Sequence, residues 1–375
     1  MDTLISLGNA FISIHDPRID RTKKHKLVDI IMITLCATIC GMEGWEDIEI
    51  FAEEREEWFR KFLELPNGIP SHDTMYRVFS RINPKELNKI LIEWTQGLNK
   101  SVDGKVVAID GKTLRGSFDT ASGQSALHMI SAWVEENGLV LGQVCAGGKG
   151  HEITKIPELL RLLELKNSIV TIDAIGCQKE IVRIIREEKT ADYVIALKKN
   201  QLNLHDEVVA CFNLAGKSDF FSSDKFESIE KGHGRIESRA CVCLDVAAHL
   251  DHVGKEFSGL KTVAKIYSTR ECNGKTEEQT RYFISSLPCK AEQIAKAVRT
   301  HWSVENSLHW RLDMTFKEDA SRIRKDNAPE NLAMIRRTAL GLVKNRLPQK
   351  MTVKRAQLRM KLNWDFALAH FFTNN

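Results

Sequence analysis

The segment 105–201 alternates short apolar runs with stretches of helical periodicity, and this alternation constrains the fold more than any other feature of the chain. Two of the apolar runs flank Asn137-Gly138, a dipeptide that favours a tight hairpin turn. A hairpin followed by alternating strands and helices predicts a mixed sheet covered by helices. The predicted elements are strands 127–134 and 139–144, helices 153–165 and 179–188, and a buried strand at 193–197.

Two aspartates follow buried strands of this segment. Asp110 ends the apolar, β-branched run 106–109, and Gly111 is expected to break that strand. Asp173 ends a similar run at 168–172. If the two strands are neighbours, both carboxylates lie at the same edge of the sheet. Each aspartate taken alone is equally consistent with a turn former or a helix N-cap.

A glutamate shares the apolar side of a predicted helix over 292–312. Glu305 falls on a stripe with spacings of four and three residues, so it is expected to point toward the core. A buried carboxylate needs a cationic partner, because burying it alone is too costly. The partner could be a metal ion or one of the nearby cations Lys296, Arg299 and Arg311. The stripe comprises Ile294, Val298, His301, Glu305, Leu308 and Leu312.

The three carboxylates together suggest a metal site. Asp110, Asp173 and Glu305 would repel one another unless divalent cations lay between their oxygens. Hard oxygen ligands favour Mg²⁺ or Mn²⁺ over zinc. A zinc site on His301, Glu305 and His309 is the weaker alternative, because no cysteine or histidine elsewhere completes it.

Several long motifs, in the same order, resemble the DDE insertion-sequence transposases, in the branch that includes the bacterial H-repeat-associated proteins. The resemblance extends from about Asp16 to Leu347. It implies that Asp110, Asp173 and Glu305 bind the catalytic metal ions. The matching segments are 108–117 (AIDGKTLRGS), 173–178 (DAIGCQ), 193–201 (YVIALKKNQ), 233–239 (HGRIESR), 301–310 (HWSVENSLHW) and 318–331 (EDASRIRKDNAPEN).

The glutamate helix departs from the pattern of the wider DDE group. Many of those relatives carry a Tyr, Arg, Glu, Lys signature there, and the matching positions in this chain are Val298, His301, Glu305 and Leu312. Only the glutamate is retained, so the roles of the other three residues do not carry over. His301 and Arg311 are candidate substitutes for DNA contact.

The predicted fold is α/β: a ribonuclease-H-like mixed-sheet catalytic core with a β-rich insertion, preceded by a helical N-terminal domain. Strands at 237–245 and 262–268 are expected in the insertion. A last helix is expected from Asn327, which with Glu330 resembles a capping box, to about Arg346. The predicted domains are 1–100 (helical), 101–201 (core, first part), 202–287 (insertion), 288–347 (core, second part) and 348–375 (helical tail).

The N-terminal domain contains a candidate DNA-recognition helix. Ser71 is a plausible N-cap for a helix over 73–82 that follows a tight turn and carries Arg77 and Arg81. Such a helix more often simply packs against its neighbours. Other helical segments are expected at 27–40 and 45–63.

The basic charge is concentrated at the C-terminal end. Residues 291–375 hold 16 Lys and Arg against 8 Asp and Glu, within a chain of net charge +4. Clustered positive charge is typical of phosphate-backbone binding, although it is also common on a solvated helical face. The longest apolar stretch, 30–42, is too short to span a bilayer. The nine cysteines contain no Cys-x-x-Cys pair, which favours reduced thiols in the cytosol.

The sequence therefore predicts a transposase that uses a pair of Mg²⁺ ions, with Mn²⁺ as a substitute, to cleave and join double-stranded DNA at the terminal repeats of its own element. We expect a homodimer on terminal-repeat and target DNA, in the cytoplasm at the nucleoid, with no membrane association. A catalytically silent DNA-binding relic and a nuclease without strand transfer are the alternatives. The cationic candidates for phosphate contact are Lys112, Arg115, Lys198, His233, Arg235, Arg322 and Arg324.

Trp302, next to His301 on the glutamate helix, has two interpretations. It is either a core aromatic or a platform on which an unpaired base at the cut DNA end stacks. Stacking would make it matter for cleavage, whereas a core role would make it matter for stability.

Overall fold

The computed structural model describes residues 2–98, 101–119, 123, 125–148, 150–216, 221–232, 234–247, 252–272 and 274–372. The chain forms two compact units. One contains residues 1–100, 111–149 and 305–375, and is called the helical unit here. The other contains residues 101–110 and 150–304, and is called the strand unit. The chain crosses between them four times: after residue 100, within strand β1 (Val106–Thr113), after residue 149 and after Val304.

The strand unit is built on a mixed sheet with the order β1-β4-β5-β9-β8-β7-β6. Strands β1, β4 (Ile169–Ile172) and β5 (Asp192–Leu197) are parallel; a hairpin and a helix connect β1 to β4, and helical turns connect β4 to β5. Helices α7 (Glu152–Leu162) and α8 (Lys179–Arg183), the latter continued by a π-helical turn to Glu188, confirm the two predicted helices.

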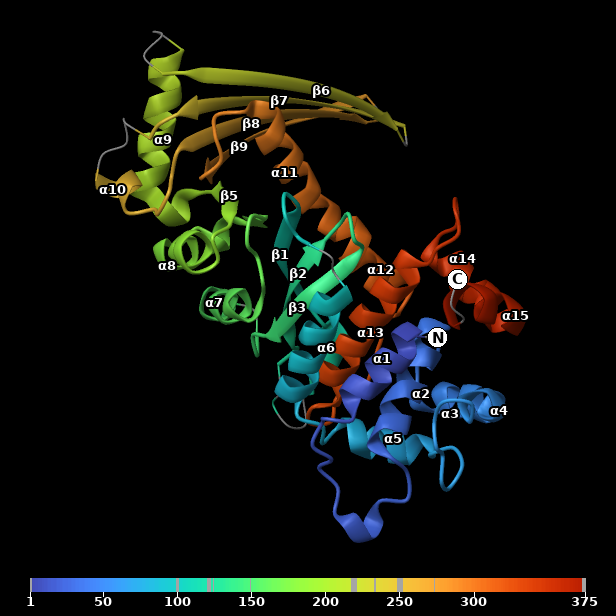
Figure 1. Cartoon of the computed structure of the whole chain (residues 1–375). Coiled ribbons are helices and arrows are strands. Elements are labelled where there is room, and N and C mark those ends of the chain that lie inside the picture. The colour runs from blue at the N-terminus through green and yellow to red at the C-terminus, as the bar shows by residue number, and fades with distance from the viewer. Residues whose placement is uncertain are drawn as a thin grey trace. The chain divides into compact units, whose positions relative to one another are not determined.

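The second half of this sheet is an antiparallel meander of long strands. They are β6 (Ser223–Gly232), β7 (Arg235–Asp245), β8 (Thr262–Cys272) and β9 (Lys275–Ser285), and β9 pairs with β5. This confirms the β-rich insertion. Helix α11 (Ala291–Val304) runs along one face of the strands (Figure 1), where its apolar residues join a core with Cys241, Cys243 and Phe283. The unit also contains α9 (Leu202–Ala215) and the short α10 (His252–Lys255).

The helical unit combines a hairpin with many helices. Strands β2 (His128–Val134) and β3 (Leu139–Cys145) form the predicted hairpin, with Gly138 at a φ of 59° in its turn. Here the strand order is β3-β2-β1. With the parallel strands of the other unit, the order β3-β2-β1-β4-β5 gives the ribonuclease-H-like arrangement.

The long helix α13 (Ala328–Asn345) is almost entirely buried and contacts α2, α6 and β3. Because so much of its surface is covered, its arginines must be neutralised inside the protein. The other helices of this unit are α1 (Asp2–Phe11), α2 (Leu27–Ile39), α3 (Trp45–Glu53), α4 (Glu56–Phe59), α5 (His72–Phe79), α6 (Pro84–Leu98), α12 (Trp310–Met314), α14 (Val353–Leu362) and α15 (Trp364–Ala367).

Some local predictions are wrong. Gly111 does not break β1, which continues to Thr113. Helix α9 was not predicted and begins the segment that was expected to be β-rich. Asn327 precedes α13 but makes no side-chain cap; its amide donates instead to the Ile82 carbonyl at 3.1 Å. The predicted cap at Ser71 is confirmed, since its hydroxyl accepts from the Thr74 N–H at 3.4 Å.

Candidate active site

Asp110 and Asp173 occupy corresponding positions on neighbouring strands. The parallel pairing of β1 with β4 aligns Ile109 with Ile172, and each aspartate is the next residue. Because parallel strands run in the same direction, both carboxylates belong to the same edge of the strand unit. The sequence expectation that these two strands are neighbours is confirmed.

Asp173 is held by the turn that follows its strand. Its Oδ1 accepts a hydrogen bond from the Ile175 N–H at 3.1 Å and so caps the 3-10 turn Ala174–Gly176. Its side chain retains solvent exposure, yet the protein atoms crowded around the carboxylate raise the pKa of Asp173. The Ile175 bond and Lys198 oppose that rise, and Glu152 adds to it. The ionised form of Asp173 is therefore less favourable than in water unless a cation lies close to it.

Glu305 does not face the core as predicted. Its side chain is 72% exposed, whereas Ile294, Leu308 and Leu312 on the same stripe are buried. The helix is π-helical from Glu305 to His309, and a π-helical turn changes the angular register on which the stripe was counted. Glu305 begins the helical unit's part of this helix, and its Oε2 lies 3.4 Å from Nδ1 of His309.

Within the described residues, none of the expected cationic partners, Lys296, Arg299 and Arg311, forms an ion pair with Glu305. Arg299 pairs with Glu230 of β6, at 2.7 Å between Nη2 and Oε2. The Nε of Arg311 is buried and has no hydrogen-bond partner within the described part of the chain. Glu305 is therefore not half of a buried ion pair.

His301 joins α11 to the strand that leads to Asp173. Its Nδ1 lies 3.1 Å from the Thr171 hydroxyl oxygen. Burial lowers the pKa of His301 to about 4, so the ring is neutral at physiological pH. A neutral imidazole bonded to β4 is suited to positioning the helix.

Trp302 is not a core residue. Its side chain is 45% exposed, and the Arg281 guanidinium of β9 lies 3.9 Å from the ring centroid. Burial lowers the pKa of Arg281. The arginine and the indole therefore form a cation-π pair on the strand unit, with part of the ring open to solvent.

Lys112 and Arg115 differ in what their charges contact. Lys112 is 7% exposed, and its Nζ lies 2.7 Å from an oxygen of Asp313 and 2.9 Å from one of Asp319. Arg115 is 83% exposed, with its Nε 3.5 Å from Asp319. The ammonium of Lys112 is thus already occupied inside the helical unit, whereas the guanidinium of Arg115 reaches solvent.

The remaining cationic candidates are spread over several elements. Arg324 donates to the Gly116 carbonyl at 3.0 Å and lies over the Phe118 ring, while Arg322 is exposed. Lys198 is exposed and close enough to Asp173 to affect its pKa. His233 lies outside the described residues.

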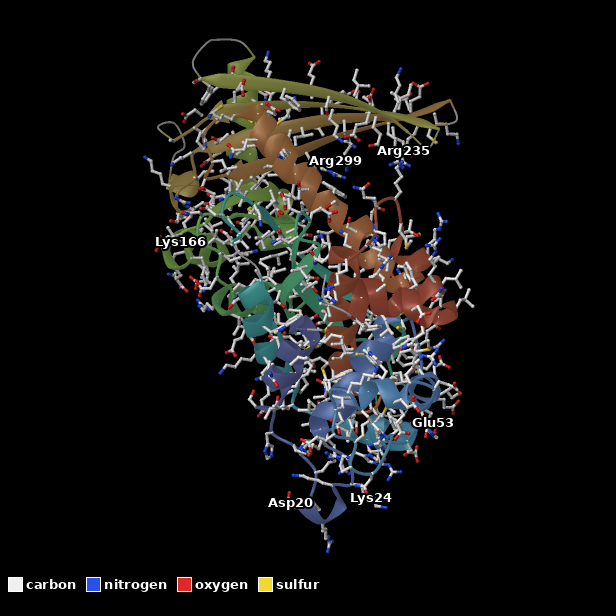
Figure 2. All side chains as sticks on the ribbon, turned by 45° about the vertical axis from the view of Figure 1, so that its right-hand side comes forward. Asp20, Lys24, Glu53, Lys166, Arg235 and Arg299 are labelled. Atoms are coloured by element: carbon white, nitrogen blue, oxygen red, sulfur yellow. The ribbon has the colours of Figure 1, made fainter. Side chains whose placement is uncertain are left out.

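Arg235 belongs to an arginine-rich network on the strand unit. Arg235 and Arg239 share one face of β7, because residues two apart point the same way, and Arg299 of α11 lies on that side (Figure 2). Among the described residues, two carboxylates bridge them: Glu237 contacts both β7 arginines, and Glu230 contacts Arg239 and Arg299.

Helix α14 presents a basic surface that was not predicted from the sequence. Its exposed cations have no acidic residue beside them on the helix, and two exposed leucines lie among them. The signal was available, since residues 347–364 contain no Asp or Glu. The exposed cations are Lys354, Arg355, Arg359 and Lys361. By contrast, Arg336 and Arg337 contribute to the C-terminal charge excess but are buried.

Asp110, inside β1, and Asp173, directly after β4, provide hard carboxylate oxygens of the kind that Mg²⁺ and Mn²⁺ prefer. The raised pKa of Asp173 fits a group that a cation would stabilise in its charged form. Across the described ranges, no three His, Cys, Asp or Glu side chains are grouped closely enough to hold a metal ion. None of the described helices is long and apolar enough to cross a membrane.

Comparisons with known proteins agree over most of the chain. Residues 102–342 match the family model described as transposase DDE domain, and residues 9–95 match the model of a domain associated with it. YncI of Escherichia coli O157:H7 is 44% identical over 346 residues, covering 91% of this chain and 87% of that protein. YhhI of Escherichia coli K12, named an H repeat-associated transposase, is 41% identical over 86% of each chain.

Two further matches are more limited. YbfQ of Escherichia coli K12, named an inactive transposase, is 51% identical over 57 residues, which cover 15% of this chain and 68% of that protein. Among solved structures, the piggyBac transposase in a synaptic complex with hairpin DNA aligns with a TM-score of 0.40 and 10% identity, covering 98% of this chain and 78% of that chain. That structural likeness is too distant to bear on function.

Proposed function

The chain belongs to the family of DDE-domain transposases, and on this premise we propose that it cleaves the terminal inverted repeats of its own insertion element and joins them to target DNA. The observation that supports this best is the alignment of Asp110 with Asp173 on adjacent parallel strands. We propose Glu305 as the third carboxylate, because its segment resembles the corresponding motif of this family.

We propose that Asp110, Asp173 and Glu305 hold a pair of Mg²⁺ ions, for which Mn²⁺ can substitute. When bound, such ions would stabilise the attacking and leaving oxygens of an in-line displacement at phosphorus. Asp173 contributes a carboxylate fixed by its own turn. Neutral His301 would keep α11 against β4, so that the segment leading to Glu305 is anchored.

The proposed DNA contacts fall into two groups. In the helical unit, Arg115, Arg322 and the basic surface of α14 would bind phosphates. In the strand unit, Lys198 and the Arg235 network would do so, and the open part of the Trp302 ring would stack on a base. Lys112, held by two aspartates, would position the segment after Asp110. We propose that the protein acts as a homodimer on its DNA.

A silent DNA-binding relic is the second candidate function. It is favoured by the relative named an inactive transposase, although that match covers 15% of this chain. The three retained carboxylates favour an active enzyme. A nuclease without strand transfer is the third candidate, and it differs from the first only in the joining step.

Cleavage of a terminal-repeat duplex by the full chain tests the proposal. We expect product with Mg²⁺ or Mn²⁺ and none with chelator. Asp110→Asn, Asp173→Asn and Glu305→Gln should each lower the rate roughly a thousandfold or more, because a metal site contributes several kcal/mol to the transition state. Glu292→Gln, an exposed glutamate on the same helix as the proposed ligand, is the matched control and should keep full activity.

The outcomes separate the candidates. Cleavage followed by transfer to a second duplex supports a transposase, and cleavage without transfer supports a nuclease. Binding of the repeats with no cleavage in either metal supports a relic. If Glu305→Gln cleaves as fast as Glu292→Gln, the assignment of the third carboxylate is wrong.

A further inference from the structure

A pocket of about 510 Å³ lies within the helical unit. Its lining comes from the beginnings of two helices, α3 and α5, from the segment 317–323, and from Arg336 of α13. A volume of this size suits a small ligand. None of the proposed catalytic carboxylates belongs to it.

Arg336 is the unusual member of this lining. Its side chain is 4% exposed, yet within the described residues its guanidinium makes no hydrogen bond or ion pair. Its neighbour Arg337 is also buried but is fully neutralised by Glu318, with Nη1 2.6 Å from Oε1. Glu318 and Glu43 act on Arg336 only at a distance, and burial lowers the pKa of Arg336. A buried cation without a direct partner requires an anion.

The start of α3 adds further donors to the same lining. The first backbone N–H groups of a helix have no acceptor within it. Here the Asp47 carboxylate accepts from the N–H groups of Glu43 and Gly44, which precede the helix. The indole N–H of Trp45 is buried, with no acceptor among the residues that the structure describes. Helix N-termini with unpaired donors favour oxyanions.

The charged side chains that line the pocket favour a small anion over a polyanion. Lys317, Arg322 and Arg336 face four carboxylates, those of Glu43, Glu46, Asp47 and Asp73. A small oxyanion can reach the buried guanidinium, whereas a polyanion such as a DNA backbone would bring several phosphates against the carboxylates. Tyr76 and Trp45 add aromatic surface on which an organic group could pack.

We infer that this pocket binds one small oxyanion, either inorganic phosphate or a phosphate monoester, through the buried Arg336 guanidinium, Arg322 and the N-terminus of α3. None of the proposed catalytic carboxylates lines this site, which shares Arg322 with the proposed DNA contacts and goes beyond the proposed function. Its ligand would stabilise the helical unit, because it binds the folded form alone.

Calorimetric titration of the full chain with sodium phosphate, against sodium chloride at equal ionic strength, tests the inference. We expect saturable phosphate binding and a phosphate-dependent rise in melting temperature. Arg336→Met should weaken binding by roughly tenfold or more, since a charge-assisted hydrogen bond is lost. Arg322→Gln, a surface change that leaves the fold intact even if Arg336→Met does not, should weaken it less. Lys89→Gln, at an exposed position of α6 outside the pocket, is the control.

The same titrations with a mononucleotide and with a terminal-repeat duplex distinguish the source of the phosphate. Tighter binding of the mononucleotide than of phosphate supports a phosphate monoester, and equal binding supports inorganic phosphate. The absence of saturable binding by the unsubstituted chain would overturn the inference. So would a fall of about one unit in the salt dependence of DNA binding in Arg322→Gln and Arg336→Met with phosphate binding unchanged, because the pocket would then be a backbone contact.

Discussion

Asp173 and Glu305 are proposed to bind the same metal ions, yet the protein holds them in different ways. Asp173 follows a buried strand, caps a turn and has a raised pKa because of the atoms crowded around it. Glu305 begins a π-helical turn and is 72% exposed. Strand pairing fixes the position of Asp173, whereas Glu305 is exposed at a π-helical turn.

This difference suggests that the strand unit supplies a preformed half of the site, whereas the glutamate depends on the helix register. Parallel pairing leaves the strand-end aspartates little freedom, because shifting either one would break the sheet. A π-helical turn is less stable than an α-helical one and is frequent at functional sites. Changes to the turn should therefore affect catalysis more than folding.

Deleting Asn306 tests this dependence and should give the largest effect. Loss of one residue allows the turn Glu305–His309 to become α-helical, which rotates Glu305 relative to the residues that follow. We expect cleavage to fall by about a hundredfold or more, as for other small misplacements of catalytic groups. Helix content and melting temperature should change little.

Asn306→Ala is the control for that deletion, because it keeps the residue count of the turn. It should cleave almost normally. Normal cleavage by the deletion variant would show that the π-helical register has no role in placing Glu305. The proposed difference between Asp173 and Glu305 would then be wrong.

Trp302→Ala tests whether the helix that precedes Glu305 contributes a contact to DNA. Since the indole is 45% exposed, its loss should lower the melting temperature only slightly. If the ring stacks on an unpaired base, cleavage of fully paired ends should fall by the equivalent of about 1–3 kcal/mol, and cleavage of mismatched ends by less. Arg281→Gln, which removes the cation above the ring, is the companion variant.

A large fall in melting temperature, with equal loss on paired and mismatched ends, would instead show that Trp302 supports the fold. Cleavage assays on both duplexes, run beside thermal melting, distinguish these results.

His301, which contacts Thr171 of β4 in the strand unit, should make the stability of the protein depend on pH. Its pKa is about 4 in the folded protein against 6.5 normally, so the unfolded chain binds the proton first. The stability due to the neutral ring is present above about pH 6.5 and is lost as the pH falls toward 4. His301→Gln should remove roughly 3 kcal/mol of that acid sensitivity.

Urea unfolding of His301→Gln and the unsubstituted chain between those pH values measures the effect. His15→Gln, an exposed histidine of the helical unit, is the control. Parallel pH profiles for all three proteins would show that His301 is not kept neutral by the fold.

The aspartates could be predicted from sequence because the signals are local. Apolar β-branched runs specify the buried strands, and the residues that end them occupy known positions. Glu305 could not be placed, because the apolar stripe assumes a uniform helical period, and the π-helical turn violates it. Local patterns also could not predict the role of Asn327. Its side-chain amide donates to the Ile82 carbonyl, which is distant in the sequence.

Buried arginines explain why the charge distribution was only partly informative. The excess after residue 290 includes Arg336 and Arg337, which no local pattern marks as buried. Both lie on α13, whose near-complete burial depends on α2, α6 and β3 from distant parts of the chain. The exposed cations of α14, in contrast, follow directly from a stretch without acidic residues.

The salt dependence of DNA binding should give the smallest effect and tests which cations of the helical unit touch phosphates. Each phosphate contact adds about one unit to the slope of log affinity against log salt. If Arg322 and Arg324 both make contacts, neutralising them together should flatten the slope by about two units. Arg324 already bonds to Gly116 and packs on Phe118, so the structure favours a smaller change, nearer one unit, that comes from Arg322. Arg355→Gln with Arg359→Gln on α14 provides the comparison, since both are exposed. A slope unchanged by either pair would place the DNA on the arginine network of the strand unit.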